Sequence, residues 1–188
     1  MSNCLPDYRW HKMRSLFFVP AHVDRFYEKA IASNADVIIL DLEDGVPANK
    51  KEDARSNVRK FLSRDRSGKT FLVRVNPLDS LHHALDFLAC MVSEADGIIL
   101  PKTRSANDVI AVANHLSEYT RKNKSDAPQI AVLPLIENAE AVLNLREIAG
   151  ASTLVKGLIF GHEDYLNDIG ALHSESALNL LFARTQLV

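Results

Sequence analysis

The stretch Val37-Ile38-Ile39-Leu40-Asp41-Leu42-Glu43-Asp44-Gly45 joins a run of apolar residues to a cluster of acidic ones. A continuous apolar run predicts a strand that is buried on both faces, here over residues 37–42, and such strands are typical of parallel sheets. Further runs of the same kind predict strands over residues 15–19, 70–75, 97–100, 130–136 and 155–160. Pro134 falls inside the run at 130–136, so a bulge or a shortened strand is expected there.

Segments whose apolar residues recur at intervals of three and four separate these runs and predict helices. They cover residues 23–32, 51–62, 81–91, 106–122, 139–148 and 176–186. Short buried strands that alternate with helices indicate βα units, so the fold class is α/β. Six such units fit either an open doubly wound sheet or most of a (β/α)8 barrel, and both folds bind ligands at the carboxyl ends of the strands.

Composition excludes several classes of protein. The chain has 188 residues, 47% of them hydrophobic, which fits one domain over residues 1–188. Its formal net charge of −2 provides no basic field for nucleic acid, and its apolar runs are too short for a membrane-spanning helix. Cys4 and Cys90 form no disulfide framework and no zinc-type spacing, so a reduced, cytoplasmic compartment is expected. Glycine-rich nucleotide motifs and a Gly-x-Ser-x-Gly elbow are absent from the sequence.

Polar residues follow five of the predicted strands. Because the carboxyl ends of parallel strands meet at one edge of a sheet, we expect these side chains to gather there, although each of them alone also fits a solvated strand end. The residues are Asp41, Glu43, Asp44, Arg74, Asn76, Lys102, Glu137, His162, Glu163 and Asp164.

Glu137 and Asp164 lie one βα unit apart, so their carboxylates are expected to converge at the ends of neighbouring strands. Hard oxygen donors of this kind are the ligands that Mg²⁺ prefers. Glu163 and Asp168 are nearby alternatives. Asp164 is favoured because Glu163 would point to the other face of a continuing strand and Asp168 lies further along the chain.

For other residues near the strands, the sequence predicts a less specific role. Arg74 is a planar bidentate donor suited to a substrate carboxylate or an enolate oxygen, and Lys102 is either a second anion contact or a solvated base. His162 is expected to be a structural residue rather than an acid or base. Simple counting places Arg14 at the opposite end of the sheet. His82 and His83 are expected at the surface. Trp10, Phe17 and Phe18 are expected to be core or packing residues.

The motifs at these strand ends resemble those of the citrate lyase β-subunit-like group of the HpcH/HpaI aldolase superfamily, which includes malyl-CoA and citramalyl-CoA lyases. The resemblance implies a TIM barrel of the phosphoenolpyruvate/pyruvate-binding type, of which this chain carries about the first six βα units. It also implies Mg²⁺ held by Glu137 and Asp164, and Arg74 in contact with an oxo acid. The motifs lie at residues 14–20, 41–44, 73–77, 100–103, 136–138 and 161–165.

The resemblance implies the reversible cleavage of a 3-hydroxyacyl-CoA, of the citryl-CoA, malyl-CoA or citramalyl-CoA type, to an acyl-CoA and a 2-oxo acid. Glu43 and Asp44 match an acidic pair that orients Arg74 or a metal-bound water, or that has a structural role. A related acyl-CoA thioesterase is an alternative, and so is a non-catalytic remnant that keeps only the metal and oxo-acid pocket. The resemblance further implies a homo-oligomer, either a trimer or a hexamer.

The sequence departs from the family pattern at several places. His162 stands where a small residue is usual, Gly45 stands where alanine is commoner, and residues 172–176 differ as well. Family members continue beyond the position of Val188, through the last barrel strands and a lid whose aspartate acts as acid or base in a neighbouring subunit. We therefore expect an N-terminal fragment or a truncated product, with little activity on its own.

Overall fold

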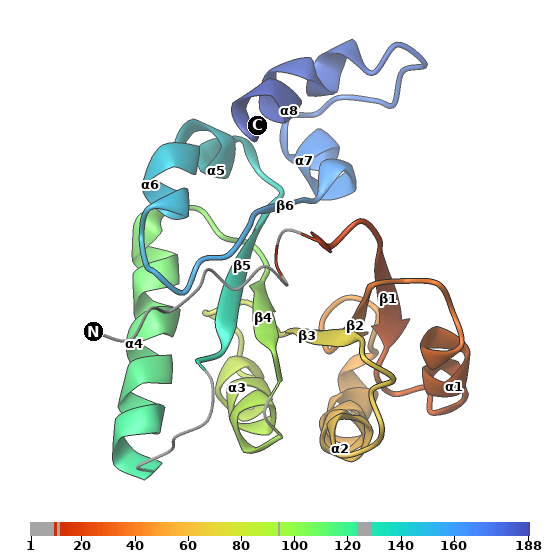
Figure 1. The fold of residues 1–188 in the computed structure, drawn as a ribbon. Coiled ribbons are helices and arrows are strands. Elements are labelled where there is room, and N and C mark those ends of the chain that lie inside the picture. Colours follow the sequence, from red (N-terminus) through yellow and green to blue (C-terminus); the bar gives the residue numbers. More distant parts are fainter. Residues whose placement is uncertain (1–9, 11, 94, 124–128) are drawn as a thin grey trace.

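A computed structural model describes residues 10, 12–93, 95–123 and 129–188. Six parallel strands form one sheet in which each strand pairs with the next along the chain, and the sheet curls into part of a barrel with helices on its outer side (Figure 1). The strands are β1 (Leu16–Pro20), β2 (Val37–Asp41), β3 (Thr70–Arg74), β4 (Gly97–Leu100), β5 (Ala131–Ile136) and β6 (Ile159–Phe160).

The helices follow the strands in the alternation expected of βα units. They are α1 (Arg25–Ile31), α2 (Lys51–Leu62), α3 (His83–Val92), α4 (Ala106–Asn123), α5 (Ala139–Leu143), α6 (Leu145–Ala149), α7 (His162–Asp168) and α8 (Leu181–Gln186), with 3-10 turns at Ala48–Lys50 and Leu178–Leu180. In the described part of the chain, none of these helices combines the length and apolarity needed to cross a membrane.

Most predicted elements are present, with ends that shift by a few residues. The helix predictions fail at two places. The helix expected over residues 139–148 is two short helices that meet at Asn144, whose side chain donates to the carbonyl of Arg104. The chain turns into α7 directly after β6, where only the end of a strand was expected.

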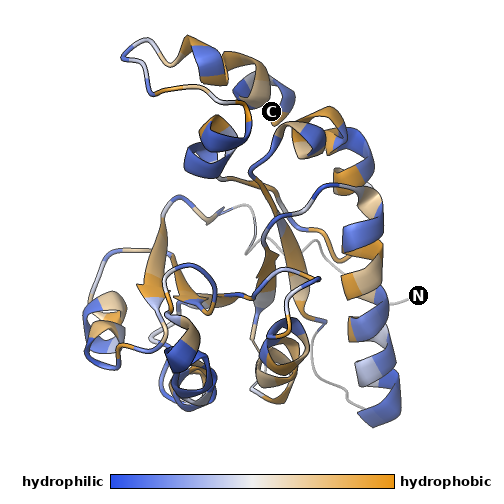
Figure 2. Cartoon of the chain, turned by 180° about the vertical axis from the view of Figure 1, so that it is seen from behind, coloured by the Kyte–Doolittle hydropathy of each residue, from blue (hydrophilic) through white to orange (hydrophobic). Residues whose placement is uncertain are grey.

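The strands are buried on both faces, as their continuous apolar sequences predicted. Alternate residues face outward and pack against the helices, in a cluster that includes Ile38, Leu40, Phe71 and Val73. The inward residues form a second cluster. Figure 2 shows the contrast, with mostly hydrophobic strands and helices that carry both hydrophobic and hydrophilic residues. The inner cluster consists of Val37, Ile39, Leu72, Ile99, Ala131, Leu133 and Leu135.

This inner cluster distinguishes the two architectures that the sequence left open. In a doubly wound sheet, helices cover both faces, whereas a barrel fills its interior with side chains from its own strands. Among the described residues, the inner face is covered by strand residues together with Trp10 and Met13. The sheet is therefore the arc of a barrel, and Trp10 has the packing role that was expected.

The bulge expected at Pro134 occurs in the segment that leads into β6, not in β5, the strand that contains the proline. β5 runs through Pro134 without a break. Val132 forms an isolated bridge with Val155, and Leu135 pairs with Ile159. The segment from Val155 to Ile159 is therefore one residue longer than the segment of β5 that it faces, which makes a bulge before β6. A proline has no N–H to donate to an adjacent strand. The strand predicted over residues 155–160 is accordingly reduced to Ile159–Phe160.

The outer strand β1 is less covered than the sequence suggested. Phe17 and Phe18 were expected to be packing residues, but they are 46% and 40% exposed. The reason is that, in the described chain, β1 has a neighbour on only one side. The ring of Phe18 instead lies beneath the guanidinium group of Arg74, 5.1 Å from its carbon to the ring centroid.

A buried polar network joins α2 and α3 to the loops that follow β2 and β3. The carboxylate of Asp86 accepts hydrogen bonds from Arg55 (3.0 Å) and from the backbone N–H and side-chain amide of Asn76. The ammonium of Lys51 donates to the carbonyls of Leu42 (2.6 Å) and Glu43 (2.8 Å) and to the Asn76 side chain. Burial is the main reason why the pKa of Lys51 is lowered.

His83 belongs to the same network, since its Nδ1 lies 2.8 Å from the carbonyl of Asn76. The side chain is buried, so the prediction of a surface position was wrong. Its helix begins at His83, two residues later than expected, and the contact with Asn76 holds the ring on the buried side of that helix.

The network yields a test of stability. Replacing Asp86→Ala removes the acceptor of Arg55 and Asn76 and leaves a largely buried guanidinium group, which should lower the free energy of unfolding by about 3 to 5 kcal/mol. Asp53→Ala, which removes an exposed pair with Lys50, should cost less than about 1 kcal/mol. Urea unfolding of both variants checks this, and equal losses would contradict the role given to the network.

Candidate functional site

The inward-facing pattern of the strands continues into polar residues at the carboxyl end of the sheet. In the pairing of β2 with β3, Asp41 stands directly beside Arg74. Glu43 and Glu137 follow β2 and β5, and both continue the alternation of residues that face the inside of the barrel. The side chains of Asp41, Glu43 and Glu137 are buried, although all three residues carry carboxyl groups.

Asp41 holds Arg74 in a bidentate ion pair. The Arg74 Nε and Nη2 atoms each donate to one carboxylate oxygen of Asp41 at 2.7 Å. The remaining nitrogen, Nη1, lies 3.2 Å from Oε2 of Glu43. Burial acts to lower the pKa of Arg74, but the hydrogen bonds and charge of Asp41 outweigh it and raise the pKa. Arg74 therefore stays charged in a fixed orientation.

Of the acidic pair Glu43 and Asp44, which was expected beside Arg74, only Glu43 lies there. Glu43 contacts Arg74, whereas the exposed Asp44 faces Lys102 at 4.0 Å. Sequence reasoning placed Asp41 among the residues at the strand ends, but it did not identify Asp41 as the main partner of Arg74. Its position at the end of a strand that neighbours the strand of Arg74 was the available signal.

Glu137, Lys102 and Asp164 form a second group. The backbone N–H of Lys102 donates to Oε1 of Glu137 at 2.6 Å, and the Lys102 ammonium donates to Oδ2 of Asp164 at 2.8 Å. The same ammonium lies 3.8 Å from Glu137 Oε1. The Lys102 ammonium therefore lies within 4 Å of both carboxyl groups. The structure thus brings the two predicted ligands together.

The two carboxyl groups differ in their surroundings. The side chain of Glu137 is 2% exposed, and this burial raises its pKa, which the hydrogen bond and charge of Lys102 only partly offset. The side chain of Asp164 is 39% exposed, and its hydrogen bond to Lys102 lowers its pKa. A proton between them therefore favours Glu137.

Asp164 does converge with Glu137, but not along the continuing strand that was expected. β6 ends at Phe160, and Asp164 lies in the first turn of α7 rather than on a continuing strand. Helical geometry turns Asp164 toward Lys102. Asp168 instead accepts a hydrogen bond from the backbone N–H of Ala139 at the start of α5.

Local backbone features allow this close grouping. A Cβ at Gly161 would lie 2.8 Å from the Cβ of Glu137, so only glycine lets the two strand ends approach this closely. Lys102 has a φ of 52°, a left-handed conformation that costs a non-glycine residue about 1 to 3 kcal/mol. This conformation accompanies the two bonds that Lys102 makes, one from its backbone N–H and one from its ammonium.

A cavity of about 500 Å³ opens beside Glu137, Lys102 and Asp164. Carboxylate oxygens of Glu137 and Asp164 are hard donors that suit a divalent cation. The Lys102 ammonium, which contacts both carboxyl groups, places a positive charge next to them. The cavity is lined by Lys102, Arg104, Glu137, Asn138, Glu140, Asp164, Asn167 and Asp168.

Comparisons with known proteins find relatives that match most of this chain. The family model described as HpcH/HpaI aldolase/citrate lyase matches residues 14–188. The citrate lyase subunit beta of Haemophilus influenzae is 31% identical over 176 residues, which cover 93% of this chain and 60% of the relative. The (3S)-malyl-CoA thioesterase of Cereibacter sphaeroides strain ATCC 17025 is 35% identical over 160 residues, which cover 85% of this chain and 52% of the relative.

A solved structure has the same fold. The citrate lyase beta subunit of M. tuberculosis, complexed with oxaloacetate and magnesium, matches with a TM-score of 0.76 and 28% sequence identity. The match covers 96% of this chain and 74% of that structure. The chain spans 60% and 52% of the lengths of the two curated relatives.

The burial of Glu43 predicts a pH dependence of stability. Burial raises the pKa of Glu43 from 4.5 to about 7, despite the nearby charge of Arg74. Between these two values the folded chain binds a proton that the unfolded chain has lost, so the free energy of unfolding should fall as the pH rises through this window.

Glu43→Gln should make this fall less steep, because glutamine carries no titrating group. Chemical unfolding at several pH values between about 4.5 and 7 measures the slope. Glu118→Gln, at an exposed position on α4, serves as the control and should keep the slope of the unchanged chain. A Glu43→Gln variant with an unaltered slope would contradict the assignment.

Proposed function

The chain belongs to the HpcH/HpaI aldolase/citrate lyase family, and from that premise we propose that it carries a Mg²⁺-dependent carbon–carbon lyase site. The proposed reaction cleaves a 3-hydroxyacyl-CoA to an acyl-CoA and a 2-oxo acid. The observation that carries the proposal is the convergence of Glu137 and Asp164 on Lys102, at the sheet edge where Asp41 orients Arg74.

Glu137 and Asp164 are the residues that would hold Mg²⁺. Their oxygens fit the ion because one buried and one half-exposed carboxyl group already face the same ammonium group. When bound, the ion would polarise the oxygens of the 2-oxo acid and offset charge that develops during cleavage. The magnesium and oxaloacetate in the structure of the M. tuberculosis relative support this proposal.

Arg74 is proposed to bind the oxo-acid portion of the substrate. Asp41 uses two of its nitrogens, which leaves Nη1 and its hydrogens on the side of Glu43. Since burial raises the pKa of Glu43 to about 7, this neighbour is partly neutral near pH 7. Nη1 is not used by Asp41, and its N–H groups can therefore donate to an anionic group of the substrate.

Lys102, Glu43 and Asp44 are proposed to border the substrate. Lys102 pairs with Asp164 and offsets part of the negative charge at Glu137 in the absence of a metal ion. A divalent cation at these oxygens would take over that role, and the freed ammonium group would be available to an anionic oxygen. Asp44 is exposed and 4.0 Å from Lys102, a position from which it can pull the ammonium group away from the carboxyl pair.

A thioesterase is the second candidate. It is favoured by the relative named (3S)-malyl-CoA thioesterase, which is 35% identical to this chain. Both candidates act on an acyl-CoA thioester, so the products distinguish them. Release of a 2-oxo acid and an acyl-CoA from malyl-CoA, citramalyl-CoA or citryl-CoA indicates the lyase, whereas free CoA and a hydroxy acid indicate the thioesterase.

The metal proposal predicts a stabilising effect of Mg²⁺. Because a ligand that binds only the folded chain raises its stability, Mg²⁺ should raise the Tm of the unchanged chain. Glu137→Gln and Asp164→Asn should each abolish that increase. Glu140→Gln, which changes an acid that lines the same cavity, should keep it. An increase that persists in both ligand variants would refute the assignment.

The role of Arg74 predicts a separate effect on the oxo acid. Arg74→Lys keeps the charge but loses the planar fork, so oxaloacetate should bind at least about tenfold more weakly in the presence of Mg²⁺. The Mg²⁺-induced increase in Tm should remain, because Arg74 does not contact the metal ligands. Calorimetric titration with oxaloacetate measures the affinity, and an unchanged affinity would rule out contact with Arg74.

A further inference from the structure

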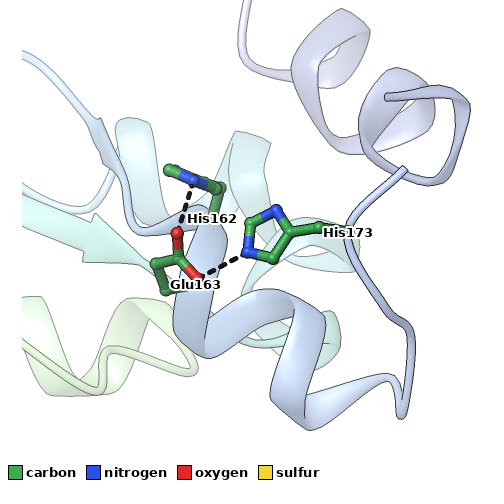
Figure 3. Close-up of side chains that lie close together, drawn as sticks. All are labelled: His162, Glu163 and His173. Atoms are coloured by element: carbon green, nitrogen blue, oxygen red, sulfur yellow. Dashed lines mark hydrogen bonds and ion pairs between the residues drawn. The ribbon is translucent and has the colours of Figure 1, made fainter. Parts of the chain in front are cut away.

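A group of exposed side chains lies beside, but apart from, the proposed magnesium ligands. The two carboxylate oxygens of Glu163 are each approached by a histidine, at 3.0 Å from Nε2 of His162 and 2.7 Å from Nε2 of His173 (Figure 3). His162 and Glu163 begin α7, and His173 lies on the segment that follows it. Two imidazoles from different segments thus converge on one carboxylate.

The spacing of the donor atoms suits a small metal ion. One nitrogen of each histidine and one oxygen of Glu163 all lie within 4.8 Å of one another. Tetrahedral zinc with bonds of about 2.0 to 2.1 Å needs donors roughly 3.3 Å apart, so movements of the order of an ångström complete the set. The two rings stand at 82° with centroids 5.7 Å apart, and both turn their Nε2 atoms toward Glu163.

The chemistry of these donors differs from that of the carboxyl pair. Imidazole nitrogens suit zinc and other divalent transition metals, whereas Mg²⁺ prefers oxygen. Asp164 turns toward Lys102, and Glu163 turns away from it toward the histidines. The two groups are therefore separate sets of ligands on neighbouring residues of one helix.

The function proposed above uses neither histidine. His162 stands where the family resemblance leads one to expect a small residue, and residues 172–176 depart from the family pattern too. Both departures belong to the same group of side chains. The sequence spacing gave no sign of this, because the ligands come from adjacent positions and a later turn rather than from a familiar Cys/His pattern.

We propose that His162, Glu163 and His173 bind one divalent transition-metal ion of the zinc type, with a fourth position open to water or another ligand. A three-residue set of two histidines and a glutamate is sufficient to hold zinc with an open position. The ion would connect the segment around His173 to α7, the helix that carries Asp164.

This connection matters because the segment has few other attachments among the described residues. Leu172 is 87% exposed, and its carbonyl accepts a hydrogen bond from the Asn179 side chain. Binding of the ion should therefore slow proteolytic cleavage between residues 170 and 177. Cleavage elsewhere in the chain should stay unchanged.

Titration of the metal-free chain with Zn²⁺, in excess Mg²⁺ to occupy the carboxyl pair, tests the proposal. We expect one zinc site per chain. His162→Ala and His173→Ala should each weaken it by at least about tenfold, in line with losses seen when support for metal ligands is removed. All three side chains are exposed, so these variants should keep the Tm of the unchanged chain.

Two controls separate this site from others. His115→Ala removes an exposed histidine on α4 and should leave zinc affinity unchanged. The double variant Glu137→Gln with Asp164→Asn should also retain the site, and His173→Ala should retain the Mg²⁺-induced increase in Tm. Equal zinc affinity in His173→Ala and the unchanged chain, or loss of zinc only in the carboxyl double variant, would overturn the proposal.

Discussion

Burial of both faces of the sheet is the constraint on which the rest of the structure depends. Helices cover the outer face, and strand side chains fill the inner one, so the strands have no place for a polar residue until they end. Charged groups therefore appear together at one edge. There, parallel pairing places Asp41 beside Arg74, and the following turns bring Glu137 to Lys102.

Burial also determines the electrostatics of that edge. It raises the pKa values of Glu43 and Glu137, while Arg74 and Lys102 act against it. Lys51, Asn76 and Asp86 hold the loops beneath the edge through hydrogen bonds to carbonyl groups and to each other. Asp41, Glu43, Arg74 and Glu137 are thus held close together and largely away from water, an environment that strengthens their interaction with a charged ligand.

Sequence periodicity predicted the strands, the order of the βα units and the edge that holds the polar residues, because burial imposes these patterns directly. It could not predict that α7 follows β6 at once, so that Asp164 reaches Lys102 from a helix rather than from a continuing strand. The pairing of Asp41 with Arg74 required the register between strands, and the bulge opposite Pro134 arose in a different strand from the proline. These features depend on contacts between segments, which a single sequence does not display.

A crystal structure of the chain with Mn²⁺ in place of Mg²⁺ and with oxaloacetate is the most direct test of the central claim. Anomalous scattering locates the manganese independently of any assumption about its ligands. We expect one peak bound by Glu137 and Asp164, with the oxo acid reaching Arg74. A peak at other residues, or oxaloacetate bound away from Arg74, would contradict the account.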